Sequence, residues 1–112
     1  MRMAVHVFST RRGRAFRLTI LDRDLWTCQM CGVLLRTGRT DMASAAVDHV
    51  RPVELRPDLA FDEANCRAVC RACHAICDSI EKRHAGDAEA IATAKLAGRK
   101  PGRMERDDGW RP

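Results

Sequence analysis

Three stretches of this chain are expected to be helical, and the first shows apolar residues at helical spacing. The first, from Phe16 to Leu25, predicts a helix over about Arg14–Asp24 with its Arg side chains on the outer face. A second helix is expected over about Cys73–Arg83, and a third over Ala88–Ala97. The first helix should pack its apolar stripe onto the part of the chain that carries the cysteine pairs.

Between the helices, the alternation of apolar and polar residues changes to a period of two. Ala45–Val50 predicts a strand, in which Asp48 and His49 point to opposite faces unless the strand twists or bulges. Met3–Phe8 is short and apolar, so a strand and a docked terminus both remain open. Asp62–Val69 predicts a helical turn that leads into a pair of cysteines.

The composition predicts a small domain with a thin core. The chain has 112 residues, with three Phe, two Trp and no Tyr, but it has six Cys that could staple the fold. We expect neither a signal peptide nor a membrane span from its N-terminal residues, and therefore a cytoplasmic protein with reduced thiols. The net charge is +5, and 17 of the 20 basic residues are Arg, which suits phosphate but also suits a GC-rich genome.

The cysteines form two Cys-x-x-Cys pairs, Cys28 with Cys31 and Cys70 with Cys73. Two such turns supply the four tetrahedral ligands of a structural zinc ion. Two further cysteines lie at helical spacing from these pairs and could enter another ligand set. We take the two regular pairs as the ligands. The two remaining cysteines, Cys66 and Cys77, are expected to be small buried apolar side chains.

A second group of polar residues lies within and just after the segment between the two pairs. A neutral His49 could take a proton from water, while a divalent ion on Asp48 could neutralise phosphate charge. Asn65 is either a turn residue or the amide that holds the His49 ring. His74 and Asp78 lie at i, i+4 on one helical face, so both could bind one ion.

The order of these motifs resembles the HNH endonuclease family, in the zinc-bound form common in phages and mobile elements. The resemblance covers about Ala15–Arg83 through CQMC, VDHVRPV, a later Asn and CRACH. It implies a small α+β fold with a ββα-metal (His-Me finger) core and a zinc site of four cysteines. It also implies that Asp48 and His74 bind the catalytic ion, that His49 is the general base, and that Asn65 orients it.

The resemblance implies a metal-dependent DNA endonuclease. We expect a monomer that nicks DNA with low sequence specificity, possessing structural Zn²⁺ and a catalytic ion such as Mg²⁺, Mn²⁺ or Ni²⁺. Phage terminase or other DNA-processing proteins are the expected partners, and no membrane is involved. The alternative is a non-catalytic zinc module that binds DNA or a protein. The arginines expected to contact DNA phosphates are Arg11, Arg12, Arg51, Arg71 and Arg83.

We therefore expect four regions along the chain. Residues 1–14 form a basic N-terminal arm, and residues 15–85 form the nuclease domain with its zinc staple. Residues 86–98 form a C-terminal helix, capped by Asp87 and followed by Gly98. Residues 99–112 form a flexible tail.

Overall fold

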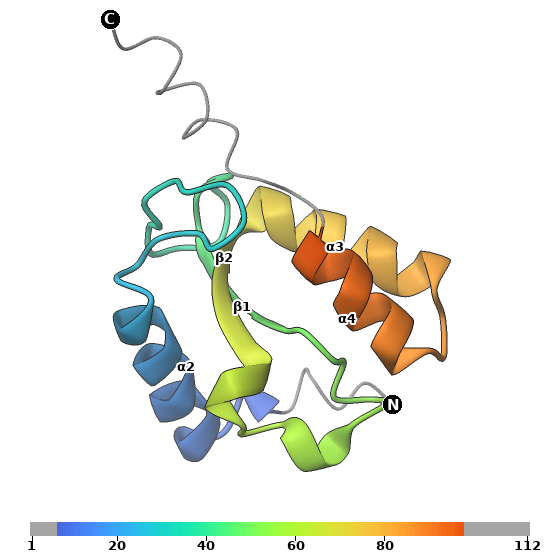
Figure 1. Ribbon diagram of the computed structural model, residues 1–112. Coiled ribbons are helices and arrows are strands. Elements are labelled where there is room, and N and C mark those ends of the chain that lie inside the picture. Colours follow the sequence, from blue (N-terminus) through green and yellow to red (C-terminus); the bar gives the residue numbers. More distant parts are fainter. Residues whose placement is uncertain (1–6, 98–112) are drawn as a thin grey trace, which may run out of the picture.

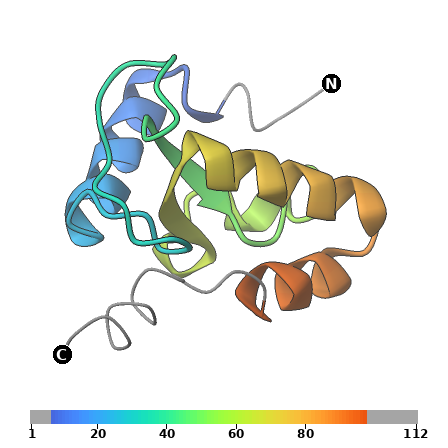
Figure 2. The ribbon, with the colours of Figure 1, turned by 90° about the horizontal axis from the view of Figure 1, so that it is seen from above.

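The computed structural model describes residues 7–97, which form a small α+β fold around one β-hairpin, as predicted. Strand β1 (Ala45–His49) pairs antiparallel with β2 (Cys66–Cys70), so that His49 lies opposite Cys66. Helix α2 packs on one side of the hairpin, α3 packs on the other, and α4 packs against α3 (Figure 1; Figure 2). The hairpin therefore separates two helical layers.

Helix α2 (Arg11–Arg23) begins three residues earlier than the pattern predicted. The Thr10 hydroxyl accepts a hydrogen bond from the Gly13 amide at 2.9 Å, which caps the helix at this point. The basic residues from Arg11 onward are consequently helical rather than part of an arm. Leu25 lies beyond the helix with a left-handed backbone (φ 56°) and is 78% exposed, so it does not belong to the buried stripe.

The hairpin corrects one expectation. We predicted a helical turn over Asp62–Val69, but helical backbone is confined to the short 3-10 helix η2 (Glu63–Asn65), and β2 follows at once. Ala68 and Val69 are fully buried, because helices cover both faces of the hairpin. A strand buried on both faces has no polar alternation, so its pattern resembles that of a helix.

The last two helices agree with the sequence. Helix α3 (Arg71–Arg83) starts at the second Cys pair, and α4 (Ala88–Ala97) matches the predicted range. Asp87 accepts a hydrogen bond from the Ala90 amide at 3.0 Å, as a cap should. Gly98, the 99–112 tail and most of the 3–8 stretch lie outside the described residues.

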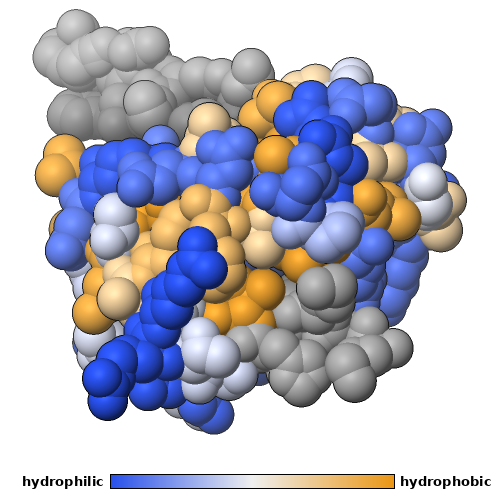
Figure 3. Space-filling view, turned by 90° about the horizontal axis from the view of Figure 1, so that it is seen from below, coloured by the Kyte–Doolittle hydropathy of each residue, from blue (hydrophilic) through white to orange (hydrophobic). Residues whose placement is uncertain are grey.

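Two clusters of buried side chains hold these layers together. The larger lies between α2, the hairpin and α3. The smaller consists of Val7, Val53 and Ala60, and Ala60 directly follows the short 3-10 helix η1 (Pro57–Leu59). On the face seen from below, hydrophobic side chains emerge in the middle and hydrophilic ones surround them (Figure 3). Every helix within residues 7–97 is too short or too polar to cross a membrane.

Candidate active site

The four predicted zinc ligands come together at one end of the hairpin. The ligand atoms of Cys28, Cys31, Cys70 and Cys73 all lie within 4.8 Å of one another. The amides of Met30 and Cys31 approach the Cys28 sulfur at 3.4 Å, and the Cys73 amide approaches the Cys70 sulfur at the same distance. Four converging sulfurs, two of which accept these backbone N–H bonds, fit a tetrahedral zinc ion.

Burial raises the pKa of Cys70 and Cys73, as it does for the two cysteines outside the cluster, and Cys31 differs from them. Burial raises the pKa of Cys31, but hydrogen bonds from the Val33 backbone and neighbouring thiols outweigh it and lower that pKa to about 7. Burial raises the pKa of Cys66 and of Cys77 to about 12, so both remain neutral thiols. Their assignment as buried apolar residues agrees with these positions.

Three of the four predicted catalytic residues, Asp48, His49 and His74, line one cleft of about 790 Å³, whereas Asn65 does not. Asp48 and His49 reach it from the end of β1, whereas His74 and Asp78 reach it from the first turns of α3. Nδ1 of His74 lies 3.9 Å from a carboxylate oxygen of Asp78, and both side chains are exposed. The i, i+4 pair is therefore formed as the helical spacing predicted.

His49 is held as a buried, neutral imidazole. Its Nε2 lies 3.0 Å from the Ala60 carbonyl oxygen, and its ring stacks on Phe8 at a centroid distance of 5.3 Å. A carbonyl only accepts hydrogen bonds, so Nε2 carries the proton and Nδ1 keeps the basic lone pair. Burial lowers the pKa of His49, and the Ala60 bond partly opposes this. The ring is therefore unprotonated near neutral pH, which is the state that a general base needs before it accepts a proton.

Asn65 is buried, but its amide does not bond the His49 ring as we expected. Its Oδ1 accepts from the Arg51 amide at 2.9 Å, and its Nδ2 donates to the Arg51 carbonyl at 3.0 Å. The Val50 amide also donates to the Asn65 carbonyl at 2.8 Å. Asn65 therefore fixes the backbone that leaves β1, and it positions His49 through the chain rather than through the ring.

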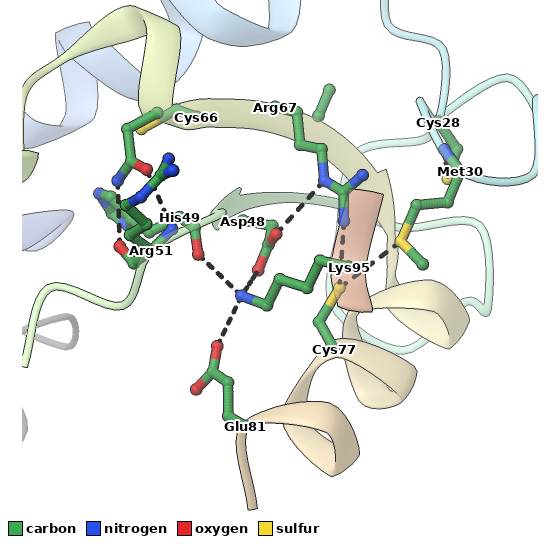
Figure 4. A network of polar contacts seen from close by, with 12 residues as sticks. Cys28, Met30, Asp48, His49, Arg51, Cys66, Arg67, Cys77, Glu81 and Lys95 are labelled. Atoms are coloured by element: carbon green, nitrogen blue, oxygen red, sulfur yellow. Dashed lines mark hydrogen bonds and ion pairs between the residues drawn. The ribbon is translucent and has the colours of Figure 1, made fainter. Parts of the chain in front are cut away.

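Asp48 is bound by two cations that the sequence analysis missed. Its Oδ1 accepts from the Lys95 ammonium at 2.9 Å, and its Oδ2 accepts from Nε of Arg67 at 3.3 Å (Figure 4). Lys95 lies four residues after the buried Ile91, so the helical spacing of α4 already placed it on the inner face. Its partner could not be inferred, because Asp48 and Lys95 lie 47 positions apart along the chain.

The catalytic ligands are consequently not assembled for a divalent ion in this arrangement. Among residues 7–97, the cysteine cluster is the only group of three or more potential ligands within 4.8 Å. Both oxygens of Asp48 are already paired, and His74 contacts Asp78 instead. The Asp48 carboxylate and the His74 imidazole suit such an ion chemically. The positive charges of Lys95 and Arg67 would repel it.

The cleft is lined by a different set of arginines from the one predicted. Of the predicted set, Arg71 lines the cleft, whereas Arg51 pairs with Glu89 and Arg12 lies over the Phe61 ring. Arg11 and Arg83 are exposed outside it. Further arginines on the cleft wall were missed, because α2 and the loop before β1 meet there only in the fold; they are Arg14, Arg17 and Arg39.

Comparison with known proteins places the family resemblance on this same segment. Residues 28–76 match the family model described as HNH endonuclease. The matched segment contains the four clustered cysteines, Asp48, His49, Asn65 and His74, and it ends before α4. No curated protein and no solved structure matches the chain.

Proposed function

We propose, because residues 28–76 match the HNH endonuclease family, that this chain is a metal-dependent endonuclease that hydrolyses phosphodiester bonds in DNA. The observation that carries the proposal is the buried, neutral His49 at a cleft shared with His74 and several arginines. A pure zinc staple requires the cysteines alone. It does not require a second set of polar residues on a common cleft.

His49 is the general base in this proposal. Nδ1 takes a proton from water, which attacks the phosphorus in line with the departing 3′ oxygen. The Ala60 carbonyl holds the His49 ring in the tautomer that is protonated on Nε2. Asn65 holds the backbone next to His49 in place. The expected products are a 5′ phosphate and a 3′ hydroxyl.

The proposal includes a catalytic ion, on the condition that the cations paired with Asp48 release one of its oxygens. An ion such as Mg²⁺, Mn²⁺ or Ni²⁺, when held by Asp48 and His74, would neutralise charge on the phosphate and on the leaving oxygen. Asp78 is the further candidate ligand on α3. With Lys95 and Arg67 in place, Asp48 offers such an ion no free oxygen.

The arginines around the cleft are suited to hold the DNA backbone. Arg39 and Arg71 are exposed on its wall, and Arg14 and Arg17 join them from α2. Contacts of this kind position phosphates without reading bases, which agrees with low sequence specificity. One cleft per chain acts on one strand, so we propose nicking by a monomer.

The direct test is nicking of a supercoiled plasmid with Mg²⁺, Mn²⁺ or Ni²⁺. His49→Ala should reduce the rate by about 10²–10⁴-fold, the usual range for loss of a general base. His84→Ala is the matched control, because His84 ends α3 and does not line the cleft. Equal nicking by wild type and His49→Ala would refute the assignment of the base.

A non-catalytic zinc module that binds DNA or a protein is the second candidate. The neutralised Asp48 favours it, because a carboxylate that only stabilises the fold would be paired in this way. DNA binding by wild type and His49→Ala, without nicking by either under any of the three ions, would establish this alternative.

The biological setting stays a prediction from the sequence. We propose a cytoplasmic protein of a bacterial host cell, acting alone or with phage terminase or mobile-element proteins. Copurification of the tagged chain from phage-infected cells would test these partners.

A further inference from the structure

Lys95 is a buried lysine whose ammonium group is fully coordinated. It donates to Asp48 Oδ1 at 2.9 Å, to the His49 carbonyl at 2.7 Å and to Glu81 Oε2 at 2.8 Å. Its side chain has no exposed surface. Figure 4 shows the chain of Lys95 extending from α4 into the space between Asp48 and Glu81. Three oxygens thus surround one positive charge beside the general base.

The charges around Asp48 are balanced without any metal ion. Lys95 and Arg67 supply two positive charges, and Asp48 and Glu81 supply two negative ones. A divalent ion on Asp48 would lie within a few ångströms of both cations. In a buried site that repulsion is strong, so the ion and the ammonium group exclude one another.

The helix that carries Lys95 is attached in a way that permits it to leave. It follows Gly86, whose backbone is left-handed (φ 82°) and has open space around its α-carbon. A second ion pair, Glu89 with Arg51, joins the helix to the segment after β1, but it is largely exposed and contributes little. Besides Lys95, the helix buries only Ile91 and Ala92 among its described residues. The matched family segment also ends before this helix.

We propose that Lys95 is an internal cation that competes with the divalent ion for Asp48, so that ion binding releases the ammonium group and undocks α4. This inference rests on the proposed metal site of the nuclease. The coupling is reciprocal: whatever holds α4 in place weakens ion binding, and the ion weakens the docking of α4. Lys95 thus acts as a latch, meaning a cation that keeps the metal site closed while α4 is docked. It lies outside the segment that matches the family.

The first test measures Mn²⁺ binding to the zinc-loaded full chain by electron paramagnetic resonance. Lys95→Met removes the charge and keeps the apolar stem, so it should bind Mn²⁺ at least about tenfold more tightly than wild type. Lys82→Met is the matched control, since Lys82 is exposed on α3 and its change should leave the affinity unaltered. Unchanged or weaker binding by Lys95→Met, or no binding by any of the three proteins, overturns the proposal.

The second test uses the wild-type chain and so does not depend on the folding of a variant. Lys95 should resist an amine-acylating reagent without Mn²⁺, and it should become reactive when Mn²⁺ is bound. Lys82 should react in both conditions, with peptide mass spectrometry as the readout. A Lys95 that remains protected when Mn²⁺ is bound overturns the latch. Plasmid nicking together with a protected Lys95 would retain the nuclease and refute only this inference.

Discussion

The thiol cluster links parts of the chain that are distant in sequence, so removing one of its ligands should be far more damaging than removing another buried thiol. Cys31 and Cys70 are 39 residues apart, and their sulfurs lie 3.8 Å from one another. Holding a loop of that length closed restricts the unfolded chain by roughly 4 kcal/mol in the chain-entropy treatment of cross-links. A domain of this class has a total stability of about 5–15 kcal/mol.

The test compares Cys31→Ala with Cys66→Ala. Cys66 is buried in the same core but lies outside the cluster, so its truncation should cost about 1 kcal/mol. Cys31→Ala should cost at least roughly 4 kcal/mol, because zinc binding itself is worth about 10–16 kcal/mol in small zinc domains. The difference between the two variants therefore isolates the metal site from the general effect of losing a buried sulfur.

The measurements are zinc content after dialysis against a chelator and the midpoint of urea unfolding. Wild type and Cys66→Ala should retain about one zinc ion per chain, and Cys31→Ala should lose it and unfold at a much lower urea concentration. The reasoning is refuted if Cys31→Ala keeps its zinc and unfolds together with Cys66→Ala. A zinc-free wild type that remains folded would also refute it.

Three further substitutions test other parts of the structure. Arg39→Ala should weaken DNA binding and lower the salt slope of the log affinity by about one, whereas Arg83→Ala, outside the cleft, should change neither in anisotropy titrations. Gly13→Ala should lower the free energy of unfolding by at least about 1–3 kcal/mol in urea titrations, although Ala normally favours helices. The reason is that its Cβ would lie 1.5 Å from a backbone oxygen. An unchanged urea midpoint would contradict this packing. Asn65→Asp should cost about 1–3 kcal/mol, since a carboxylate cannot donate to the Arg51 carbonyl; a variant as stable as wild type would show that the amide does not hold the loop.

The local features of this protein follow from its sequence because they depend on short-range spacing. The two Cys-x-x-Cys turns predicted the thiol cluster, since each turn presents two sulfurs to the same side. The range of α4 and its Asp87 cap were predicted because capping is decided within a few residues. The Asp48–His49 pair was identified from its position between the two Cys-x-x-Cys pairs, and both residues do line the cleft.

Only the tertiary structure decided which partners these residues have. Asn65 bonds the Arg51 backbone instead of a ring, and Cys66–Cys70 is a strand because β1 lies beside it. Lys95 meets Asp48 from 47 positions away, through the docking of α4 on α3. Charge pairing and strand pairing act through space, so no spacing along the chain could specify them. Asp48 and His49 could be identified as candidate catalytic residues from the sequence. That Lys95 pairs with the Asp48 carboxylate was decided by the fold.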